Sequence, residues 1–147
     1  MHGRDCEAAL RVTFRYYAPF IPTPPETISR MLEVGKVGRD DVLYDLGCGD
    51  GRILIAAVKQ FGVKKAVGFE IRKDLYEAAV KEVEKHGMQD RVLIENKDFH
   101  EADLSKATII TLYLTGTANS DLKPKFEKEC KPGTRIVSRV FIIDGWK

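Results

Sequence analysis

The segment DLGCGDGR, residues 45–52, has the most restrictive residue spacing in the chain. Glycine occupies every second position, at Gly47, Gly49 and Gly51, directly after Asp45 and an apolar run. Glycine permits positive φ and lets a ligand approach backbone N–H groups that a side chain would cover. A helix that opens after such a turn adds partial positive charge at its N-terminus. The segment is therefore either a ligand-binding turn or a tight strand-to-helix turn that binds nothing.

The spacing does not fit two phosphate-binding patterns. The dinucleotide pattern G-x-G-x-x-G would place its third glycine at residue 52, where this chain has Arg52. The Walker pattern requires Gly-Lys-Ser/Thr, which does not follow. The segment instead reads D-x-G-x-G-x-G, an acidic residue followed by alternating glycines.

Three other residues, which come later in the chain, could complete a binding site. Glu70 closes the apolar run KAVGFE, and the segment NKDF contains Asp98 and Phe99. A carboxylate at a strand end can accept hydrogen bonds from both hydroxyls of a ribose. Asp98 could accept from an adenine amino group while Phe99 lies against the ring. The structural alternatives are a solvated strand-end glutamate, an ordinary loop aspartate and a core phenylalanine.

These residues need a scaffold that brings strand ends together, and the chain has an alternating one. Short apolar or β-branched runs occur at residues 41–46, 65–70, 91–96, 107–114 and 134–143, with helical patterns between most of them. Such alternation predicts an α/β fold with a doubly wound, mainly parallel sheet. Ligands of such sheets bind at the carboxyl ends of the strands.

The helical patterns end at recognisable stops. Stripes of apolar residues repeat at helical spacing and end at Gly62, at Gly87 and at Pro132-Gly133. We also expect one extra helix before the first strand, with Thr23 as its cap and Pro24 at its first position. The length of 147 residues predicts a single domain, with residues 1–35 as an N-terminal arm and helix and residues 41–147 as the α/β core.

Composition and charge narrow the class of protein. The net charge of +2 does not indicate a nucleic-acid binder, for which a strongly basic domain is expected. Cys6, Cys48 and Cys130 lack ligand spacing, so neither a disulfide framework nor a metal site is expected, and a reducing cytoplasm is the default compartment. No apolar run is long enough to span a membrane.

The run D-x-G-x-G-x-G resembles motif I of the class I S-adenosylmethionine-dependent methyltransferases. More of the chain, from PFIPTPPETISRMLEVGKVGRDDVLYDLGCGDGR to KKAVGFEI and LKPKFEKECKPGTRIVS, resembles a small family of seven-β-strand protein-lysine methyltransferases. That family comprises archaeal proteins of broad substrate range and mitochondrial relatives. The resemblance implies a Rossmann-like fold and S-adenosyl-L-methionine as cofactor.

The resemblance also implies roles for individual residues. The methionine part of the cofactor would be held by Asp45, Gly47, Gly49 and Gly51, the ribose by Glu70, and the adenine by Asp98 and Phe99. Thr23 lies where the N-terminal segment of such proteins folds over the cofactor, a role compatible with capping a helix.

The resemblance points to the ε-amine of exposed protein lysines as the methyl acceptor. The Asn/Asp-Pro-Pro-aromatic motif of adenine methyltransferases is absent after the fourth predicted strand, where the chain reads TLYLTGTAN. Tyr113, Thr115 and Asn119 are the polar catalytic candidates there, each with a structural role as the alternative. A small molecule or RNA as acceptor, or a cofactor-binding module without activity, are the competing interpretations.

The chain stops near the end of the fifth predicted strand, whereas the family continues for two more strands. A bare strand at residues 134–143 would be an aggregation hazard. We therefore expect either a truncated product or an edge covered by a partner, including self-association through this strand.

Overall fold

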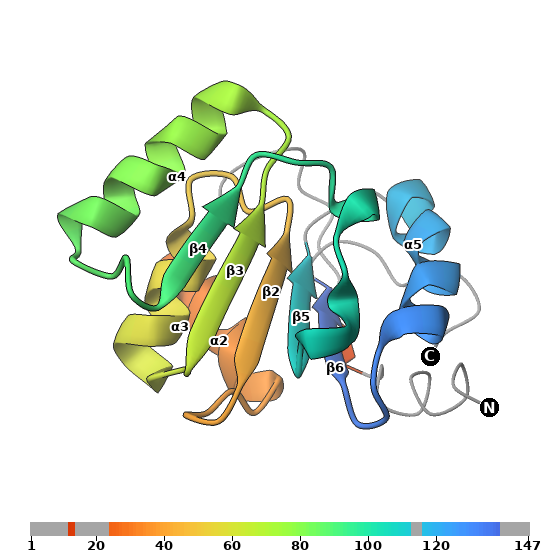
Figure 1. Ribbon diagram of the computed structural model, residues 1–147. Helices are drawn as coiled ribbons and strands as arrows, with labels where there is room; N and C mark the ends of the chain where they lie inside the picture. The colour runs from red at the N-terminus through yellow and green to blue at the C-terminus, as the bar shows by residue number, and fades with distance from the viewer. Residues whose placement is uncertain (1–11, 14–23, 113–115, 139–147) are drawn as a thin grey trace.

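The computed structural model describes residues 12–13, 24–112 and 116–138. Its strands are β1 (Val12–Thr13), β2 (Val42–Leu46), β3 (Lys65–Phe69), β4 (Val92–Glu95), β5 (Ile109–Leu112) and β6 (Arg135–Ser138). They form one sheet in the order β1-β6-β5-β2-β3-β4, and every neighbouring pair is parallel (Figure 1). The five predicted strands and the parallel α/β fold are confirmed.

The chain fills the sheet outward from β2 in two directions. β3 and β4 follow on one side, and the chain then returns to place β5 and β6 on the other side. The strand order thus reverses between β2 and β5, which is the position where open α/β sheets bind their ligands. The carboxyl ends of β2 and β5 therefore lie side by side at this edge of the sheet.

Helices cover both faces of the sheet (Figure 1). One core cluster joins the sheet to α2 (Pro25–Val34), α3 (Arg52–Phe61) and α4 (Lys73–Lys85). The other joins it to α5 (Gly116–Glu129) and to the single 3-10 turns η1 (Phe99–Glu101) and η2 (Leu104–Lys106). Side chains alternate between the two faces along each strand, so Leu43 belongs to the first cluster and Tyr44 to the second.

The predicted helix stops are confirmed, with one correction at α2. Gly62 and Gly87 follow α3 and α4 and both have a φ of 66°, a left-handed conformation that favours glycine. At α2, however, the N-cap is Pro24 and the first helical residue is Pro25. Pro24 has an extended backbone with ψ of 152°, because a residue before proline is disfavoured in helical conformation. Thr23 lies outside the described residues.

The expectation of a bare fifth predicted strand is wrong over part of its length. β1 pairs with β6 through Val12↔Val137 and Thr13↔Ser138, so β6 has neighbours on both sides there. Val137 is accordingly fully buried. The two residues of β1 are too few to show a strand pattern in the sequence. The remainder of the predicted strand, residues 139–143, lies outside the described part of the chain.

Candidate functional site

The glycine turn leaves β2 and opens α3 at the carboxyl edge of the sheet. Gly47, Gly49 and Gly51 have φ values of 79°, 57° and 83°, the left-handed region in which side chains are strained. The turn is fixed to β3, because the backbone N–H groups of Gly47 and Cys48 both donate to the carbonyl of Phe69, at 2.8 and 3.0 Å.

The glycines of this turn do not all serve the same purpose. A β-carbon added to Gly49 would meet no atom within 4 Å, so this backbone faces open space. A β-carbon on Gly51 would lie 3.3 Å from the β-carbon of Ala79 on α4. Gly51 therefore allows α3 to pack closely against α4, whereas Gly49 leaves open space in front of the turn that a ligand can occupy.

Asp45 lies at the carboxyl end of β2, and its side chain is almost completely buried, with 2% exposed. The hydroxyl of Thr111 on β5 donates to Asp45 Oδ1 at 2.9 Å. Burial raises the pKa of Asp45 from 3.8 to about 7; the Thr111 hydrogen bond opposes this rise, and the nearby Glu70 and Asp50 carboxylates reinforce it. A cation placed beside Asp45 would stabilise its ionised form.

Glu70 lies directly after β3, and both of its carboxylate oxygens already accept backbone hydrogen bonds. The N–H of Gly49 donates to Oε1 at 2.8 Å, and that of Arg72 donates to Oε2 at 3.0 Å. Glu70 therefore ties the glycine turn to the end of β3. A carboxylate has about four lone-pair positions, so it can still accept two hydroxyls.

Asp98 and Phe99 follow β4 at the same edge of the sheet. Asp98 Oδ1 accepts from the backbone N–H of His100 at 2.9 Å and contacts its Nδ1 at 2.8 Å. The backbone hydrogen bond from His100 is the largest of the interactions that lower the pKa of Asp98. The Phe99 ring lies 4.7 Å from the His100 ring and packs against the second core cluster. Asp98 thus caps η1 and Phe99 packs against the core. These contacts are the structural roles that the sequence offered as alternatives to adenine binding.

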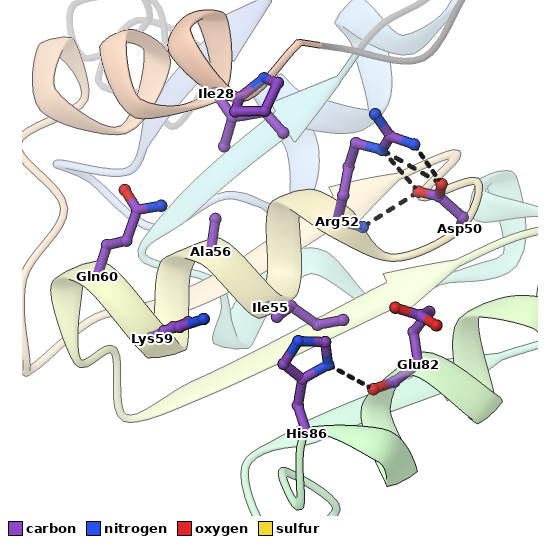
Figure 2. Close-up of a pocket in the computed structure, with 10 residues that line it drawn as sticks. Ile28, Asp50, Arg52, Ile55, Ala56, Lys59, Gln60, Glu82 and His86 are labelled. Atoms are coloured by element: carbon purple, nitrogen blue, oxygen red, sulfur yellow. Dashed lines mark hydrogen bonds and ion pairs between the residues drawn. The ribbon is translucent and has the colours of Figure 1, made fainter.

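Asp50 adds a third carboxylate to this edge. The guanidinium of Arg52 pairs with it, with Nη2 at 2.7 Å from Oδ2, and this hydrogen bond is the main cause of the lowered pKa of Asp50 (Figure 2). Asp45, Asp50 and Glu70 therefore surround the N-terminus of α3, where a dinucleotide-binding protein would hold a pyrophosphate. Asp50 is paired with Arg52, so the carboxylate of Glu70 and the ionised form of Asp45 are the groups that disfavour that anion and favour a ligand with positive charge.

A pocket over α3 is separate from the Asp45 and Glu70 side chains. It lies between α2 and α4 and is lined by Ile28, Arg52, Ile55, Lys59 and His86, among others (Figure 2). It reaches the glycine turn through Asp50 and Arg52, but neither Asp45, Gly49 nor Glu70 lines it. Within residues 12–13, 24–112 and 116–138, no group of acidic, histidine and cysteine side chains could hold a metal ion.

The structure does not describe the side chains of four predicted site residues. Thr23, Tyr113 and Thr115 lie outside the described residues. Asn119 lies on α5, whose first turns are described for the backbone alone. Asp45, Gly47, Gly49, Gly51, Glu70, Asp98 and Phe99 all lie at the carboxyl ends of β2, β3 and β4, as the parallel arrangement requires.

The model of the ANTKMT methyltransferase domain matches residues 45–147, which begin at the aspartate of the glycine turn. The chain belongs to the ANTKMT methyltransferase family. It is 52% identical over 130 residues to a protein-lysine N-methyltransferase of Saccharolobus islandicus (strain REY15A), an alignment that covers 88% of this chain and 81% of that protein.

Two further relatives of this methyltransferase have different described acceptors. The adenine nucleotide translocase lysine N-methyltransferase of Mus musculus is 28% identical over 93% of this chain, which spans 59% of the mouse protein. A solved structure described as an RNA methyltransferase from Salinibacter ruber, in complex with S-adenosyl-L-homocysteine, is 43% identical. The two structures superimpose with a TM-score of 0.84, and the match covers 86% of this chain and 82% of the Salinibacter ruber chain. The family resemblance and the fold are confirmed by these matches.

Three residues of the methyltransferase edge escaped prediction. Asn96 Nδ2 donates to the carbonyl of Glu70 at 2.8 Å and so fixes the end of β3. Ile71, with 66% of its side chain exposed, presents apolar surface beside Glu70. Thr111 lies within the apolar run ATIITLYL and looked like core. An asparagine after a strand was a readable signal for Asn96, whereas the contact of Thr111 depends on strand register.

Proposed function

We propose that the protein transfers a methyl group from S-adenosyl-L-methionine to the ε-amine of exposed lysines on other proteins. The observation that carries the proposal is the 52% identity to the archaeal protein-lysine N-methyltransferase over most of both chains. The archaeal source of that relative also supports the archaeal origin that the resemblance implies. Among the described residues, no helix is long and apolar enough to cross a membrane. Cys48 and Cys130 are both buried thiols, which supports a reducing cytoplasm as the compartment.

The carboxyl edge of the sheet fits this cofactor chemically. S-adenosyl-L-methionine carries positive charge on its sulfonium and its ammonium, and the edge offers the carboxylates of Asp45 and Glu70 with the open backbone of Gly49. Asp45 with the three glycines would hold the methionine part, Glu70 the ribose, and Asp98 with Phe99 the adenine. Thr23 would close over the bound cofactor.

The protein's part in the reaction is to bind and orient its two substrates. The bound cofactor supplies an electrophilic methyl group whose leaving thioether is neutral, so no general acid is needed. The attacking lysine must first lose a proton, because its unperturbed pKa is about 10.4. Exclusion of water from the edge favours the neutral amine. Contacts with the protein hold the amine in line with the methyl group. Tyr113, Thr115 and Asn119 remain candidates for contact with the amine.

Loss of Glu70 should weaken cofactor binding. For Glu70→Ala we expect a loss of about 1.5–3 kcal/mol, the range for hydrogen bonds to a charged group, or roughly 10- to 150-fold in affinity. Calorimetric titration of S-adenosyl-L-homocysteine measures this, with circular dichroism to establish that the variant is folded, because the Gly49 N–H also loses its acceptor. Unchanged affinity in a folded variant would show that Glu70 does not bind the cofactor.

RNA is the second candidate acceptor, because the 43% identical structure from Salinibacter ruber is described as an RNA methyltransferase. The net charge of +2 favours protein over RNA, since nucleic-acid binding relies on basic surface. Incubation with labelled cofactor and a cell extract, followed by mass spectrometry of the protein and RNA fractions, tests both. We expect methyl-lysine in proteins. Label confined to RNA or metabolites would refute the lysine acceptor, and absence of label together with retained cofactor binding would indicate a binding module.

A further inference from the structure

Thr111 is a buried hydroxyl in a strand whose other residues are apolar. β5 contains Ile109, Ile110, Thr111 and Leu112, and all four are fully buried. Burying a hydroxyl is unfavourable unless it forms a hydrogen bond, and valine would fill the same volume without that cost. The hydroxyl finds its acceptor on Asp45, at 2.9 Å.

Strand register determines this contact. β2 and β5 are parallel neighbours, and Asp45 is the register partner of Thr111. Both side chains lie on the face of the sheet that carries Leu43 and Ile109, because side chains alternate along each strand. The hydroxyl is therefore held at the carboxyl end of β2 by the backbone of the sheet, next to the glycine turn.

The surroundings of Asp45 oppose its ionisation. Glu70 at the end of β3 and Asp50 in the glycine turn both raise the pKa of Asp45, although Arg52 pairs with Asp50. Cys48 in the same turn is buried, and burial raises the pKa of its thiol, so it stays neutral and adds no charge beside Asp45. The neighbouring position on β3 is Gly68, which has no side chain. Among the described residues none forms an ion pair with Asp45.

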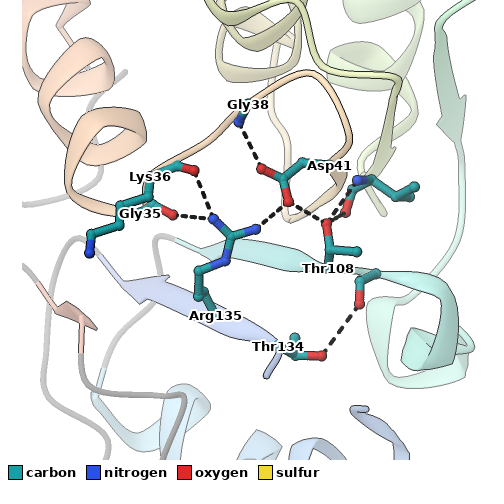
Figure 3. A network of polar contacts seen from close by, with 9 residues as sticks. Gly35, Lys36, Gly38, Asp41, Thr108, Thr134 and Arg135 are labelled. Carbon is teal, nitrogen blue, oxygen red and sulfur yellow. Dashed lines mark hydrogen bonds and ion pairs between the residues drawn. The ribbon is translucent and has the colours of Figure 1, made fainter. Parts of the chain in front are cut away.

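The same pair of strands contains a matched contact at its other end. Thr108, just before β5, donates to Asp41 Oδ1 at 2.7 Å, just before β2 (Figure 3). Asp41 differs from Asp45 because the guanidinium of Arg135 also binds it. Each aspartate therefore has a threonine donor from the neighbouring strand, and, within the described part of the chain, a cation pairs with Asp41 and none with Asp45.

We propose that Thr111 is a positioning residue for cofactor binding, because its hydroxyl fixes the Asp45 carboxylate and keeps it ionised at the carboxyl edge of the sheet. The hydrogen bond stabilises the charged form of Asp45 against burial and against Glu70 and Asp50. An ionised Asp45 attracts the positively charged methionine part of the cofactor, whereas a protonated Asp45 does not. The inference rests on the proposed cofactor role of this edge.

The test compares Thr111→Val, which keeps the shape and removes the donor, with the wild type across pH. Carbon NMR of the Asp45 carboxyl in the free protein should show a titration near pH 7 in the wild type and at higher pH in Thr111→Val. The dissociation constant of S-adenosyl-L-homocysteine should rise about tenfold or more in the variant at about pH 6. The two constants should converge towards about pH 9, where Asp45 is ionised in both proteins. Titration of the ligand's own amine cancels in the ratio.

Two control variants separate positioning from simple loss of packing. Thr111→Ser keeps the hydroxyl and should restore the wild-type pH profile. Thr108→Val removes the matched hydroxyl from Asp41 and should lower stability. Its dissociation constant for S-adenosyl-L-homocysteine should stay close to that of the wild type, a ratio near one, at every pH. A ratio for Thr111→Val that does not change with pH, or an unchanged Asp45 titration, would overturn the proposal. Failure of the wild type to bind S-adenosyl-L-homocysteine would overturn the proposed function as well.

Discussion

β2 has one buried aspartate at each end, and the protein stabilises the two in different ways. Asp41, before the strand, is 8% exposed and accepts from the N–H of Gly38 and the hydroxyl of Thr108, both at 2.7 Å, and from Arg135 (Figure 3). Arg135 in turn donates to the carbonyls that follow α2. Asp45, at the carboxyl end of the strand, is 2% exposed and accepts one hydrogen bond from a hydroxyl, that of Thr111.

The difference indicates which end of the sheet is structural and which is prepared for a ligand. At the amino end, a cation from β6 neutralises Asp41, so the network joins the α2–β2 connection to two strands and is complete in itself. At the carboxyl end, Asp45 lies near the like charges of Glu70 and Asp50, an arrangement that lowers stability. A positively charged ligand would reduce the repulsion among these carboxylates. Binding of such a ligand would therefore recover part of the stability that the functional site loses.

The largest expected effect is at the structural end. Asp41→Asn removes the partner of Arg135 and leaves a partly buried guanidinium with carbonyl acceptors alone. We expect a loss of about 3 kcal/mol in the free energy of unfolding, at the low end for a broken buried ion pair because Arg135 is partly exposed. Urea denaturation at neutral pH measures it. A loss below about 0.5 kcal/mol, typical of surface substitutions, would contradict a structural role for this network.

Asp45→Asn should have the opposite effect and increase the free energy of unfolding. A folded pKa raised from 3.8 to about 7 means that the folded protein binds more protons than the unfolded chain between these values. The free energy of unfolding therefore falls as pH rises through that window and is constant above it. The full shift corresponds to roughly 4 kcal/mol, and we expect the buried amide to recover about half, or about 2 kcal/mol, near pH 8.

Urea denaturation of Asp45→Asn and the wild type at several pH values provides the measurement. The stability advantage of the variant should shrink as pH falls towards about 4, because the wild-type carboxyl is then neutral in the folded state. Wild-type stability that does not change across this window, or a variant less stable than the wild type near pH 8, would show that Asp45 carries no such cost.

The smallest expected effect concerns Gly49. Gly49→Ala should cost about 1 kcal/mol of stability, because its φ of 57° is strained for alanine although the added carbon meets no atom within 4 Å. Cofactor binding should weaken by more, in free energy, than the folded state is destabilised, since the added methyl occupies the space in front of the turn. Gly51→Ala is the matched control, because its added carbon would press on Ala79 instead. Unchanged cofactor affinity in a folded Gly49→Ala variant would mean that the turn has no ligand contact there.

The parts of the fold that depend on local pattern were predictable. The apolar runs that became β2 to β6 are covered by helices on both faces, so their hydrophobicity marks them directly. The glycine turn was readable because positive φ restricts the residue type. The positions of the candidate residues Asp45, Glu70 and Asp98 at strand ends follow from the same alternating pattern.

The parts that depend on register and distant pairing were not predictable. Thr111 and Asp45 meet because β5 returns to lie beside β2, and no periodicity reveals which residues then face each other. The contacts of Asp41 with Thr108 and Arg135 join segments far apart in the chain, so no local pattern indicates them. β1 pairs through two residues, fewer than any strand pattern requires.

The most direct test of the account is calorimetric titration of S-adenosyl-L-homocysteine into the wild type, Asp41→Asn and Asp45→Asn at neutral pH. The account predicts that affinity is independent of stability: the less stable Asp41→Asn binds like the wild type, while the more stable Asp45→Asn loses about tenfold or more in affinity. If Asp45→Asn binds as tightly as the wild type, the carboxyl end of β2 does not hold the cofactor and the central claim is wrong.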